Sequence, residues 1–523
     1  MRTFSLCLLA LFAPHVGAND KPNVVVILAD DLGCGDLRAL NPDGKIPTPN
    51  LDALAASGCA FTDAHSPSAV CSPTRYGLLT GRYAWRSKLQ NGVLGGLSPR
   101  LIEPGRLTVA QLLKDNGYHT ACVGKWHLGM DWQLKPEKKV SELSIEPREQ
   151  VFNVEYDKPI KNGPNAVGFD YYFGISASLD MVPYTFIEND KVAANPTEDR
   201  DLTMFAGKPG RTRKGPAAPG FEAESVLPEL TKRAVGYIAA REKAGGGLGE
   251  PAGGSPNKQS KPFFLYMPLT TPHTPVAPSK EWAGKSKLNA YADFVMETDA
   301  AVGAVLAALK KHGFEENTLV IFTSDNGCSP QADYPALLKL GHNPSYKFRG
   351  TKADVFEGGH RVPLLVRWPA RVKPKTTSGE LVCLTDLMAT VAEVIDAKVP
   401  ANAAEDSFSI LPALGLSQGR PRTHLVVHSI NGSFGVREGK LKLCLCRGSG
   451  GWSAPRPGKD EAGLPDVQLY DLDADIGEKA NLHEKHAGAV VRITKLLEDW
   501  VEKGRSTPGP AQKNAVPVVI RKK

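Results

Sequence analysis

The chain has 523 residues, of which 41% are hydrophobic and 23% are charged. This balance is ordinary for a globular protein and excludes a disordered chain, a coiled coil and a collagen-like fibre. The net charge is only +7, which is too weak over this length to indicate nucleic-acid binding but suits a small anionic substrate. The length predicts two to four domains, or one large α/β unit with an appendage.

Residues 1–18 have the pattern of an export signal. Met1-Arg2 provides a positive start, an apolar stretch follows, and Val16-Gly17-Ala18 is a small-residue cleavage site. The stretch is too short for a lasting membrane span, and no later run of about 20 apolar residues exists. We therefore expect a signal peptide over residues 1–18, no stable membrane insertion, and export to the periplasm or the extracellular space. An uncleaved anchor is the alternative.

Short apolar runs that end in turns predict buried parallel strands, and helical patterns alternate with them. The strand-like runs are residues 24–28, 118–123, 263–267 and 318–322. The helical patterns are residues 108–116, 224–242 and 291–312. This alternation predicts an α/β fold with a large, mostly parallel central sheet flanked by helices on both faces.

The amino-acid composition and the hydrophobic pattern change in the later parts of the chain. Residues 244–261 are rich in Gly, Ser and Lys and predict a flexible surface insertion. Beyond about residue 400, three short hairpin-like strands and a helix at 484–503 follow. We predict a large α/β domain over residues 19–400, a smaller C-terminal α+β subdomain built on an antiparallel sheet over residues 401–505, and a disordered tail over residues 506–523.

The nine cysteines do not indicate a disulfide scaffold or a zinc knuckle, because their density is low and no Cys-x-x-Cys pattern occurs. Cys7 lies in the predicted signal peptide. Setting Cys71 aside as well leaves seven, an odd number, so at least one other thiol is expected to be free. No pairing follows from the sequence.

The most distinctive segment begins at Cys71 and reads Cys-Ser-Pro-Thr-Arg. Ser72 can cap a helix and Pro73 fits the first helical position. Arg75 follows Cys71 by four residues, so both side chains can lie on one side of the first turn. The Cys71 side chain would then face free N–H groups, the positive helix end and a guanidinium, which together can bind an anion. A buried structural cysteine explains this segment alone equally well.

Two acidic pairs follow predicted strands. Asp30, Asp31 and Asp325 supply carboxylates and Asn326 supplies an amide oxygen. Such oxygen ligands suit Ca²⁺ or Mg²⁺ better than Zn²⁺, and ligands collect beyond the carboxyl ends of strands in sheets of this kind. The four side chains can converge only if the two strands are neighbours in the sheet. Each pair alone is more often a strand-end turn.

Two further segments carry histidine and lysine. Lys125 and His127 alternate, so in an extended segment their side chains would point the same way. His273 lies between two prolines, and Lys352 precedes a glycine-rich stretch that permits close approach of the backbone. Without other evidence, each could be an ordinary structural or surface residue.

Together these motifs resemble the type I sulfatases of the alkaline phosphatase superfamily, in particular the arylsulfatase A and galactosamine-6-sulfatase type. The matching segments are Asp30-Asp31, Cys71–Arg82, Gly124–Gly129, Thr271–Pro275, Ser324–Gly327, Gly350–Pro363 and Leu469–Leu482. The resemblance covers nearly the whole mature chain, and residues 132–166 and 187–260 are its loosest parts. One departure is Ile476, where the family often has proline.

The resemblance implies that Cys71 is oxidised to formylglycine by a formylglycine-generating enzyme. It implies one Ca²⁺, with Mg²⁺ as the alternative, held by Asp30, Asp31, Asp325, Asn326 and the modified Cys71. It implies that the catalytic residues are Cys71, Arg75, Lys125, His127, His273 and Lys352.

The implied mechanism begins with the hydrated aldehyde at position 71, one hydroxyl of which attacks sulfur. Lys125, Lys352 and His273 would hold the sulfate oxygens, and His273 would protonate the leaving oxygen. His127 would then remove the proton of the second hydroxyl, so that the aldehyde reforms and sulfate leaves. A plain Ser or Cys ester has no second hydroxyl, which is the physical reason to oxidise Cys71.

The expected function is therefore that of a sulfuric ester hydrolase of arylsulfatase type. The natural substrate would be a sulfated carbohydrate, such as 6-sulfated galactose or N-acetylgalactosamine, and a small aryl sulfate should also be cleaved. Candidate sugar contacts on loops next to the motifs are Asp180, Tyr184, His342 and His360. One alternative is a phosphomonoester or phosphonate hydrolase of the same superfamily, which would need more metal ligands. Another is a catalytically silent protein that binds sulfated glycans, and a third is an unmodified Cys71 thiolate that acts directly, against which the missing second hydroxyl argues.

Overall fold

A computed structural model describes residues 21–243 and 261–521. The predicted signal peptide and residues 244–260 of the predicted insertion lie outside the described residues. The main sheet has ten strands. In spatial order they are β15 (Thr376–Ser378), β2 (Cys59–Phe61), β14 (Leu364–Arg367), β13 (Thr318–Ser324), β1 (Asn23–Asp30), β12 (Phe263–Pro272), β4 (His119–Lys125), β5 (Tyr171–Ile175), β6 (Ile187–Glu188) and β7 (Lys191–Val192).

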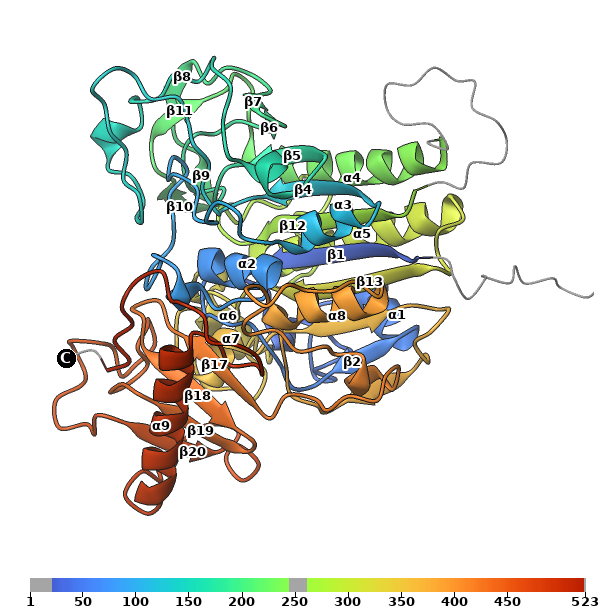
Figure 1. The fold of residues 1–523 in the computed structure, drawn as a ribbon. Coiled ribbons are helices and arrows are strands. Elements are labelled where there is room, and N and C mark those ends of the chain that lie inside the picture. Colours follow the sequence, from blue (N-terminus) through green and yellow to red (C-terminus); the bar gives the residue numbers. More distant parts are fainter. Residues whose placement is uncertain (1–20, 244–260, 522–523) are drawn as a thin grey trace, which may run out of the picture.

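The sheet is parallel at its centre and mixed towards its edges (Figure 1). Strands β13, β1, β12, β4 and β5 run parallel to one another. Strand β14 is antiparallel to both of its neighbours, and β6 and β7 form an antiparallel edge. The central strands are buried on both faces, which explains why they appear in the sequence as continuous apolar runs.

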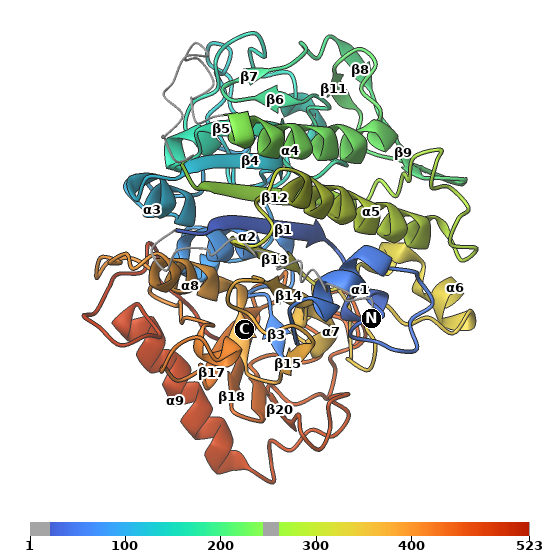
Figure 2. The ribbon, with the colours of Figure 1, turned by 90° about the vertical axis from the view of Figure 1, so that its right-hand side faces the viewer.

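Helices cover both faces of the sheet, as predicted. One face carries α1 (Pro49–Ala56), α4 (Val226–Lys243) and α5 (Ala290–Lys311), and the other carries α2 (Cys71–Thr80), α3 (Val109–Asp115) and α8 (Leu387–Val394). Alternate residues of β1 serve the two layers: Val24 and Val26 join the core beneath α2, α3 and α8, while Val25 and Ile27 join the core beneath α1, α4 and α5. Helices α4 and α5 lie side by side (Figure 2).

Helices α3 and α5 begin at polar side chains that accept from free N–H groups. Asn289 precedes α5 and accepts from the backbone N–H of Ala292, and Thr108 does the same for Gln111 in α3. Helix α2 ends at Gly81, which has φ 65° and closes the last turn. The observed bounds lie within about two residues of those predicted for the three long helical patterns.

A small lobe formed by residues 187–221 lies beyond the carboxyl ends of the central strands (Figure 1). It contains two two-stranded sheets, β8 (Glu198–Arg200) with β11 (Gly215–Ala217) and β9 (Thr203–Phe205) with β10 (Lys208–Arg211). Shorter elements elsewhere are β3 (Ala64–His65), β16 (Val382–Cys383), α6 (Tyr334–Lys339) and α7 (Glu357–His360).

The C-terminal subdomain has the predicted α+β form. Its antiparallel sheet consists of β17 (His424–His428), β18 (Phe434–Glu438), β19 (Leu441–Cys444) and β20 (Gln468–Asp471), and α9 (Ala487–Lys503) covers one face. On that face Val436 and Leu443 pack with Leu497 and Trp500. The opposite face packs against Val355 and Phe356 of the large domain. The boundary near residue 400 stays a prediction.

The tail differs from the predicted disorder. Ser506 and Thr507 are buried, the N–H of Ala515 donates to the carbonyl of Arg86 at 2.7 Å, and Ile520 packs against the core of the C-terminal subdomain. Residues 506–521 contain no helix or strand, but backbone hydrogen bonds hold them. A composition rich in proline, glycine and lysine cannot distinguish such a segment from a disordered one.

Among the described residues, no helix combines the length and the apolar character that crossing a bilayer requires.

A buried ion pair ties the tail and the C-terminal half to the large domain. Asp406 accepts from the Arg86 guanidinium at 2.8 and 2.9 Å, from the N–H of Tyr83 at 2.9 Å and from the N–H of Ser506 at 3.1 Å. Burial alone would raise the pKa of Asp406, but Arg86 and these donors outweigh it and lower the pKa. This contribution to stability is therefore present above the pKa of the unfolded state and is lost as the pH falls through the folded value.

We expect Asp406→Asn to lower the free energy of unfolding by about 3–5 kcal/mol, because it leaves a buried guanidinium without its counter-charge. The matched control is Glu438→Gln, which breaks an exposed pair with Arg492 at 2.7 Å and should cost less than about 1 kcal/mol. Urea denaturation followed by circular dichroism measures both. Equal, small losses would contradict the assigned importance of Asp406.

Candidate active site

The two acidic pairs converge at the carboxyl ends of neighbouring strands. Strands β1 and β13 pair in parallel with Ala29 opposite Ser324, so the residues that follow each strand meet. The N–H of Asp31 donates to Asp325 Oδ1 at 3.2 Å. Asp31 has φ 66°, and this turn of the backbone places two consecutive carboxylates at one strand end.

Two oxygens in this group are buried without a hydrogen-bond partner. They are Asp30 Oδ1 and Asn326 Oδ1, in side chains with no exposed surface. The amide nitrogen of Asn326 donates to Asp31 Oδ1 at 2.7 Å, which leaves its oxygen as the free atom. Buried oxygens without donors are costly, and carboxylate and amide oxygens are the ligands that Ca²⁺ and Mg²⁺ prefer. The residues present therefore fit a divalent cation held by Asp30, Asp31, Asp325 and Asn326.

Three basic side chains surround these carboxylates. Arg75 Nη2 lies 2.7 Å from Asp325 and 3.3 Å from Asp30, Lys125 Nζ lies 2.5 Å from Asp30, and Lys352 Nζ lies 2.6 Å from Asp31. All six side chains are almost completely buried.

The carboxylates compete for this positive charge. Burial alone would raise the pKa of Asp30, but Lys125 and Arg75 lower it well below its ordinary value. Burial and the neighbouring negative charge of Asp30 raise the pKa of Asp325 to about 6. Asp325 is therefore the carboxylate whose negative charge its burial and its acidic neighbour disfavour.

Cys71 is the first residue of α2 and only 2% exposed. Burial raises the pKa of its thiol, and the charges of Lys125 and Lys352 oppose this rise. The predicted cap is wrong in one detail: Val70 precedes the helix, and Ser72 lies in its first turn, where its hydroxyl accepts from the N–H of Leu94 at 3.2 Å. Cys71 nevertheless lies close enough to Lys125, Lys352, Asp30 and Asp325 for their charges to act on its thiol.

Lys125 and His127 both reach the site, but not through an extended segment. Strand β4 ends at Lys125, and His127 has φ 56°, a left-handed conformation. His127 Nε2 lies 2.8 Å from the carbonyl of Leu94, so Nε2 carries the proton and Nδ1, which is buried without a partner, is the free acceptor. Burial, followed by the charges of Lys125 and Arg75, keeps the pKa of His127 well below its ordinary value, so the ring is neutral.

His273 lies opposite on the next strand end. Pro272, the last residue of β12, pairs with Asp30, so His273 follows at the level of Asp31. Its Nδ1 donates to the carbonyl of Thr274 at 2.6 Å, and its Nε2 lies 3.7 Å from Asp31. The nitrogen available for chemistry is therefore Nε2.

The loop that carries Lys352 is bound on several sides. The N–H of Lys352 donates to Cys328 and that of Ala353 to Ala69, two residues before Cys71, at 2.9 and 2.8 Å. Further along, the N–H of Glu357 donates to the carboxylate of Glu478 in the C-terminal subdomain at 2.7 Å. The position of Lys352 thus depends on both parts of the molecule.

Sequence reasoning missed Ser178. Its hydroxyl accepts from Lys125 Nζ at 2.6 Å, and the residue is 1% exposed. It lies three residues beyond Ile175, the end of β5, which is the neighbour of β4. The rule that ligands gather beyond strand ends could have identified it, but the strand was not recognised in the sequence.

The predicted sugar contacts are placed very differently. Asp180 pairs with Arg213 Nη1 at 2.8 Å and keeps 14% of its side chain exposed. Tyr184 is 1% exposed, and its hydroxyl lies 2.7 Å from Thr212 Oγ1 inside the protein. Asp180 can meet a ligand in this arrangement, whereas Tyr184 supports the protein around it.

His342 and His360 are buried away from solvent. His342 bonds to Asp36 at 2.9 Å, and His360 bonds to His65 and to Lys442, both at 3.0 Å. The structure does not support either ring as a sugar contact, because nearness to a motif in the sequence does not determine which way a side chain points.

His360 belongs to a second buried group that contains metal-ligand types, His65, Glu357 and His360. The ammonium of Lys442 already lies 2.9 Å from Glu357 and 2.8 Å from Glu478, so this group has its own cation. All eight cysteines in the described ranges are free, so none of them forms a disulfide.

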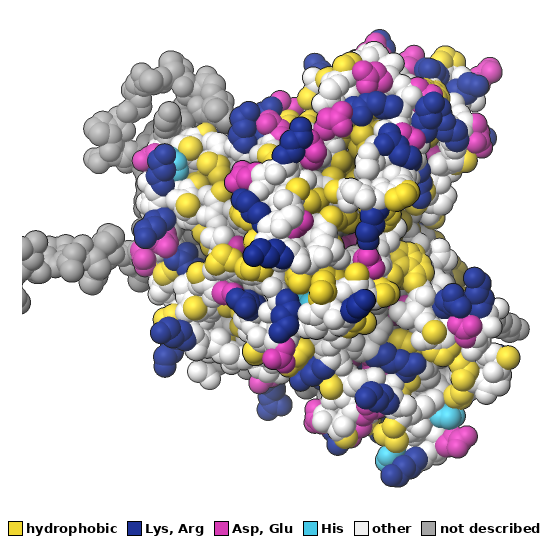
Figure 3. All heavy atoms as spheres, turned by 180° about the vertical axis from the view of Figure 1, so that it is seen from behind, with side chains coloured by type: hydrophobic (Ala, Val, Ile, Leu, Met, Phe, Trp, Pro, Cys, Tyr) yellow, Lys and Arg dark blue, Asp and Glu magenta, His cyan; other side chains and the backbone are white. Residues whose placement is uncertain are grey.

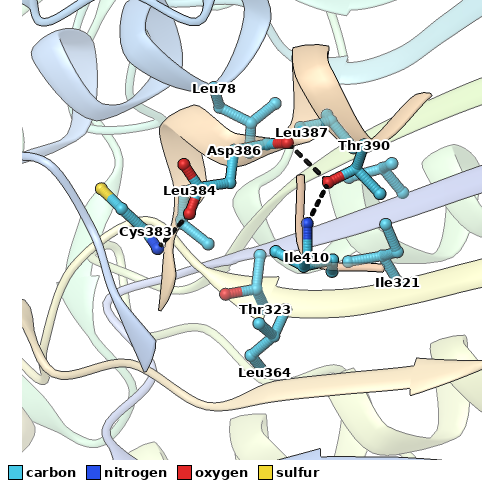
Figure 4. A pocket seen from close by; sticks show the side chains of 11 residues that line it. Leu78, Ile321, Thr323, Leu364, Cys383, Leu384, Asp386, Leu387, Thr390 and Ile410 are labelled. Carbon is cyan, nitrogen blue, oxygen red and sulfur yellow. Dashed lines mark hydrogen bonds between the residues drawn. The ribbon is translucent and has the colours of Figure 1, made fainter. Parts of the chain in front are cut away.

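A small cavity is lined by residues of α2, β13, β14 and α8 (Figure 4). Its volume is about 30 Å³, and its walls are mostly apolar, with Leu78, Ile321 and Leu364 among them. Thr390 accepts there from the N–H of Ile410 at 3.0 Å and donates to the carbonyl of Asp386 at 2.7 Å. Thr323 Oγ1, which also lines the cavity, has no hydrogen-bond partner. The volume is close to that of a single water molecule, so the cavity is a packing gap too small for a substrate.

Comparisons with known proteins agree on one family. A family model described as Sulfatase matches residues 22–397. The N-acetylgalactosamine-6-O-sulfatase of Bacteroides thetaiotaomicron is 32% identical over 92% of this chain and 93% of its own, and human arylsulfatase A is 31% identical over 94% and 89%. A solved B. thetaiotaomicron sulfatase, described with the metabolism of multiple glycosaminoglycans, superposes with a TM-score of 0.74 at 30% identity, covering 92% of this chain and 99% of that one.

We expect Ca²⁺ to raise the melting temperature by a few degrees, because a cation at one hundred times its Kd adds about 2.7 kcal/mol to stability. Differential scanning fluorimetry with and without Ca²⁺ or Mg²⁺ measures the shift. Asp325→Asn should lose most of it, whereas Asp473→Asn, at an exposed position, should keep it. The same shift in both variants would place the cation elsewhere.

Proposed function

The chain belongs to the sulfatase family and is a sulfuric ester hydrolase; we propose that it releases sulfate from a sulfated carbohydrate by means of an oxidised Cys71 and one calcium ion. The observation that carries the proposal is the single buried group in which the Cys71 thiol experiences the charges of Lys125, Lys352, Asp30 and Asp325. A sulfate ester brought to this group would meet a nucleophile, fixed positive charge and proton carriers together.

We propose Asp30, Asp31, Asp325, Asn326 and the modified Cys71 as the cation ligands. Bound there, Ca²⁺ (or Mg²⁺) would supply Lewis-acid polarisation of a sulfate oxygen and favour ionisation of the nucleophile. The two buried oxygens without partners support this assignment. A cation would also compete with Lys125 and Lys352 for the carboxylates, which makes the ammonium groups available to an anionic substrate.

Oxidation of Cys71 to formylglycine would supply, on hydration, two hydroxyls on one carbon, one to attack sulfur and one to expel the sulfate. The chain's own residues determine what surrounds that carbon. Arg75 is held rigidly by Asp325 and by the carbonyl of Lys125 at 2.8 Å, so its charge is fixed beside the first turn of α2. Lys125, Lys352 and Ser178 provide donors for the sulfate oxygens.

The two histidines divide the proton transfers. His127 is neutral with a free Nδ1, which fits a base that takes a proton as the ester collapses. His273 directs Nε2 towards the acidic group, which fits a donor to the leaving oxygen. In this division His273 supplies the proton to the leaving oxygen and His127 removes one as the ester collapses.

A sulfated sugar is the substrate class that we propose, with 6-sulfated galactose or N-acetylgalactosamine as the specific candidate. The relative named N-acetylgalactosamine-6-O-sulfatase supports this choice, since it matches 92% of the chain. Basic and acidic side chains are mixed on the face seen in Figure 3. The positive charge that would bind an anionic substrate therefore lies in the buried site rather than on that surface. The signal peptide predicted over residues 1–18 agrees with export, and a formylglycine-generating enzyme of the host would act before or during it.

A phosphatase or a silent glycan-binding protein is less well supported. Two-metal phosphatases need a second cation beside the first, and the second ligand group among the described residues is the one around Lys442. A silent binder would have lost catalytic side chains, whereas all six predicted catalytic residues are present.

We expect Cys71→Ala to reduce sulfate release at least about a thousandfold, because the variant has no nucleophile at position 71. The matched control, Cys446→Ala, changes a half-buried cysteine in the C-terminal subdomain and should retain activity. Ion chromatography of sulfate released from galactose 6-sulfate measures both.

Peptide mass spectrometry of the active wild-type protein should show an aldehyde at position 71. Normal turnover by Cys71→Ala, or an unmodified thiol in fully active protein, would refute the proposed chemistry.

A further inference from the structure

Two residues beyond Ser178, the chain carries a carboxylate that the proposed mechanism does not use. Asp180 Oδ2 accepts from Arg213 Nη1 at 2.8 Å. Asp180 Oδ1 is buried and has no partner, although 14% of the whole side chain remains accessible and 44% of Arg213 does. One oxygen of the Asp180 carboxylate therefore has no hydrogen-bond donor, and this residue lies two positions beyond Ser178, which binds Lys125.

Arg213 is held in place by Tyr184. The N–H of Tyr184 donates to the carbonyl of Pro216 and its hydroxyl to the carbonyl of Arg213 itself, at 2.9 and 2.5 Å. Residues 180–184 and 212–218 thus form one unit, where the lobe of residues 187–221 meets the strand ends (Figure 1). The buried tyrosine is a positioning residue for the pair.

The same unit adjoins the segment that binds His127. The carbonyl of Leu94 accepts from His127, and the N–H of Leu97 donates to Glu146 at 2.6 Å. A Cβ on Gly96 would lie 1.8 Å from the carbonyl of Val182, so the two segments are in close contact. The charge of Arg213 also acts on Glu146. The pair and His127 are therefore connected through residues 94–97.

We propose that Asp180 and Arg213 form a subsite that recognises hydroxyl groups of the sugar that carries the sulfate; this inference rests on the proposed function. The accessible part of the Asp180 carboxylate can accept a hydrogen bond from a sugar hydroxyl, and the accessible Arg213 guanidinium can donate one to a neighbouring hydroxyl oxygen. The two charges cancel, so the subsite suits a neutral hexose or N-acetylhexosamine. A uronic acid would bring its carboxylate close to that of Asp180 and is disfavoured.

This subsite lies in a part of the chain where the resemblance to the family is loose, since Arg213 falls within residues 187–260. The proposed catalytic residues come from strand ends, from α2 and from the loop of Lys352, whereas Arg213 of the subsite comes from the lobe. Specificity can then change without disturbing the charged group around Cys71.

The experiment compares binding and turnover. Isothermal titration calorimetry on Cys71→Ala protein with methyl galactoside 6-sulfate reports binding without hydrolysis. Adding Asp180→Ala or Arg213→Met should raise Kd about 10- to 100-fold, as expected for loss of a hydrogen bond between a hydroxyl and a charged group. In protein with intact Cys71, the ratio of kcat/KM for this sugar to that for p-nitrophenyl sulfate should fall by a similar factor.

Monodeoxy analogues identify the hydroxyls. An analogue that lacks the recognised hydroxyl should bind wild-type and Asp180→Ala sites almost equally, so the two losses are not additive. The matched controls are Asp201→Ala and Arg211→Met, which break an exposed pair at 2.6 Å in the same lobe and should leave Kd unchanged.

Unchanged Kd in both subsite variants would overturn the proposal. So would additive losses with every deoxy analogue, or equal losses of kcat/KM on the sugar and on p-nitrophenyl sulfate. Failure of the proposed function looks different, because wild-type protein would then release no sulfate while Kd would still depend on Asp180.

Discussion

The Arg75 guanidinium is the interaction on which the site depends. It bonds to Asp325 at the end of β13, lies 3.3 Å from Asp30 at the end of β1, and donates to the carbonyl of Lys125 at the end of β4. One side chain from the first turn of α2 thus connects three strand ends. Because Arg75 and Cys71 share that turn, the same contacts that fix the helix also fix the residue proposed as nucleophile. An arginine is needed here, since only its planar fork offers donors in several directions at once.

The site is built from charges that cannot all be satisfied by one another. Three carboxylates and three basic side chains are buried together, yet oxygens of Asp30 and Asn326 remain without donors and the pKa of Asp325 is raised to about 6. A buried group of this kind costs free energy of folding, and proteins accept such costs at functional sites. The two apolar cores, one on each face of the sheet, offset this cost and hold β1 in place.

The sequence allowed the α/β fold, the main strands and the grouping of the acidic pairs to be predicted, because apolar runs and strand-end acids follow from local rules. Three details depended on tertiary structure. The cap of α2 falls on Val70, since the Ser72 hydroxyl is used by Leu94. His127 reaches the site through a left-handed turn, which no alternation pattern predicts. Ser178 was missed because strand β5 was not recognised in the sequence, and Arg213 because only the packed lobe brings it to Asp180.

Lys442 and Glu478, in the C-terminal subdomain, bind Glu357 in the loop that also carries Lys352. All three are buried, so the seam between the two parts of the molecule is electrostatic as well as apolar. In a chimera of two homologous proteins, residues 349–361, β19 and the segment after β20 should therefore all come from the same parent. A crossover that separates them would replace this matched set of charges by a mismatched one. The C-terminal subdomain of one homologue therefore cannot simply be exchanged for that of another.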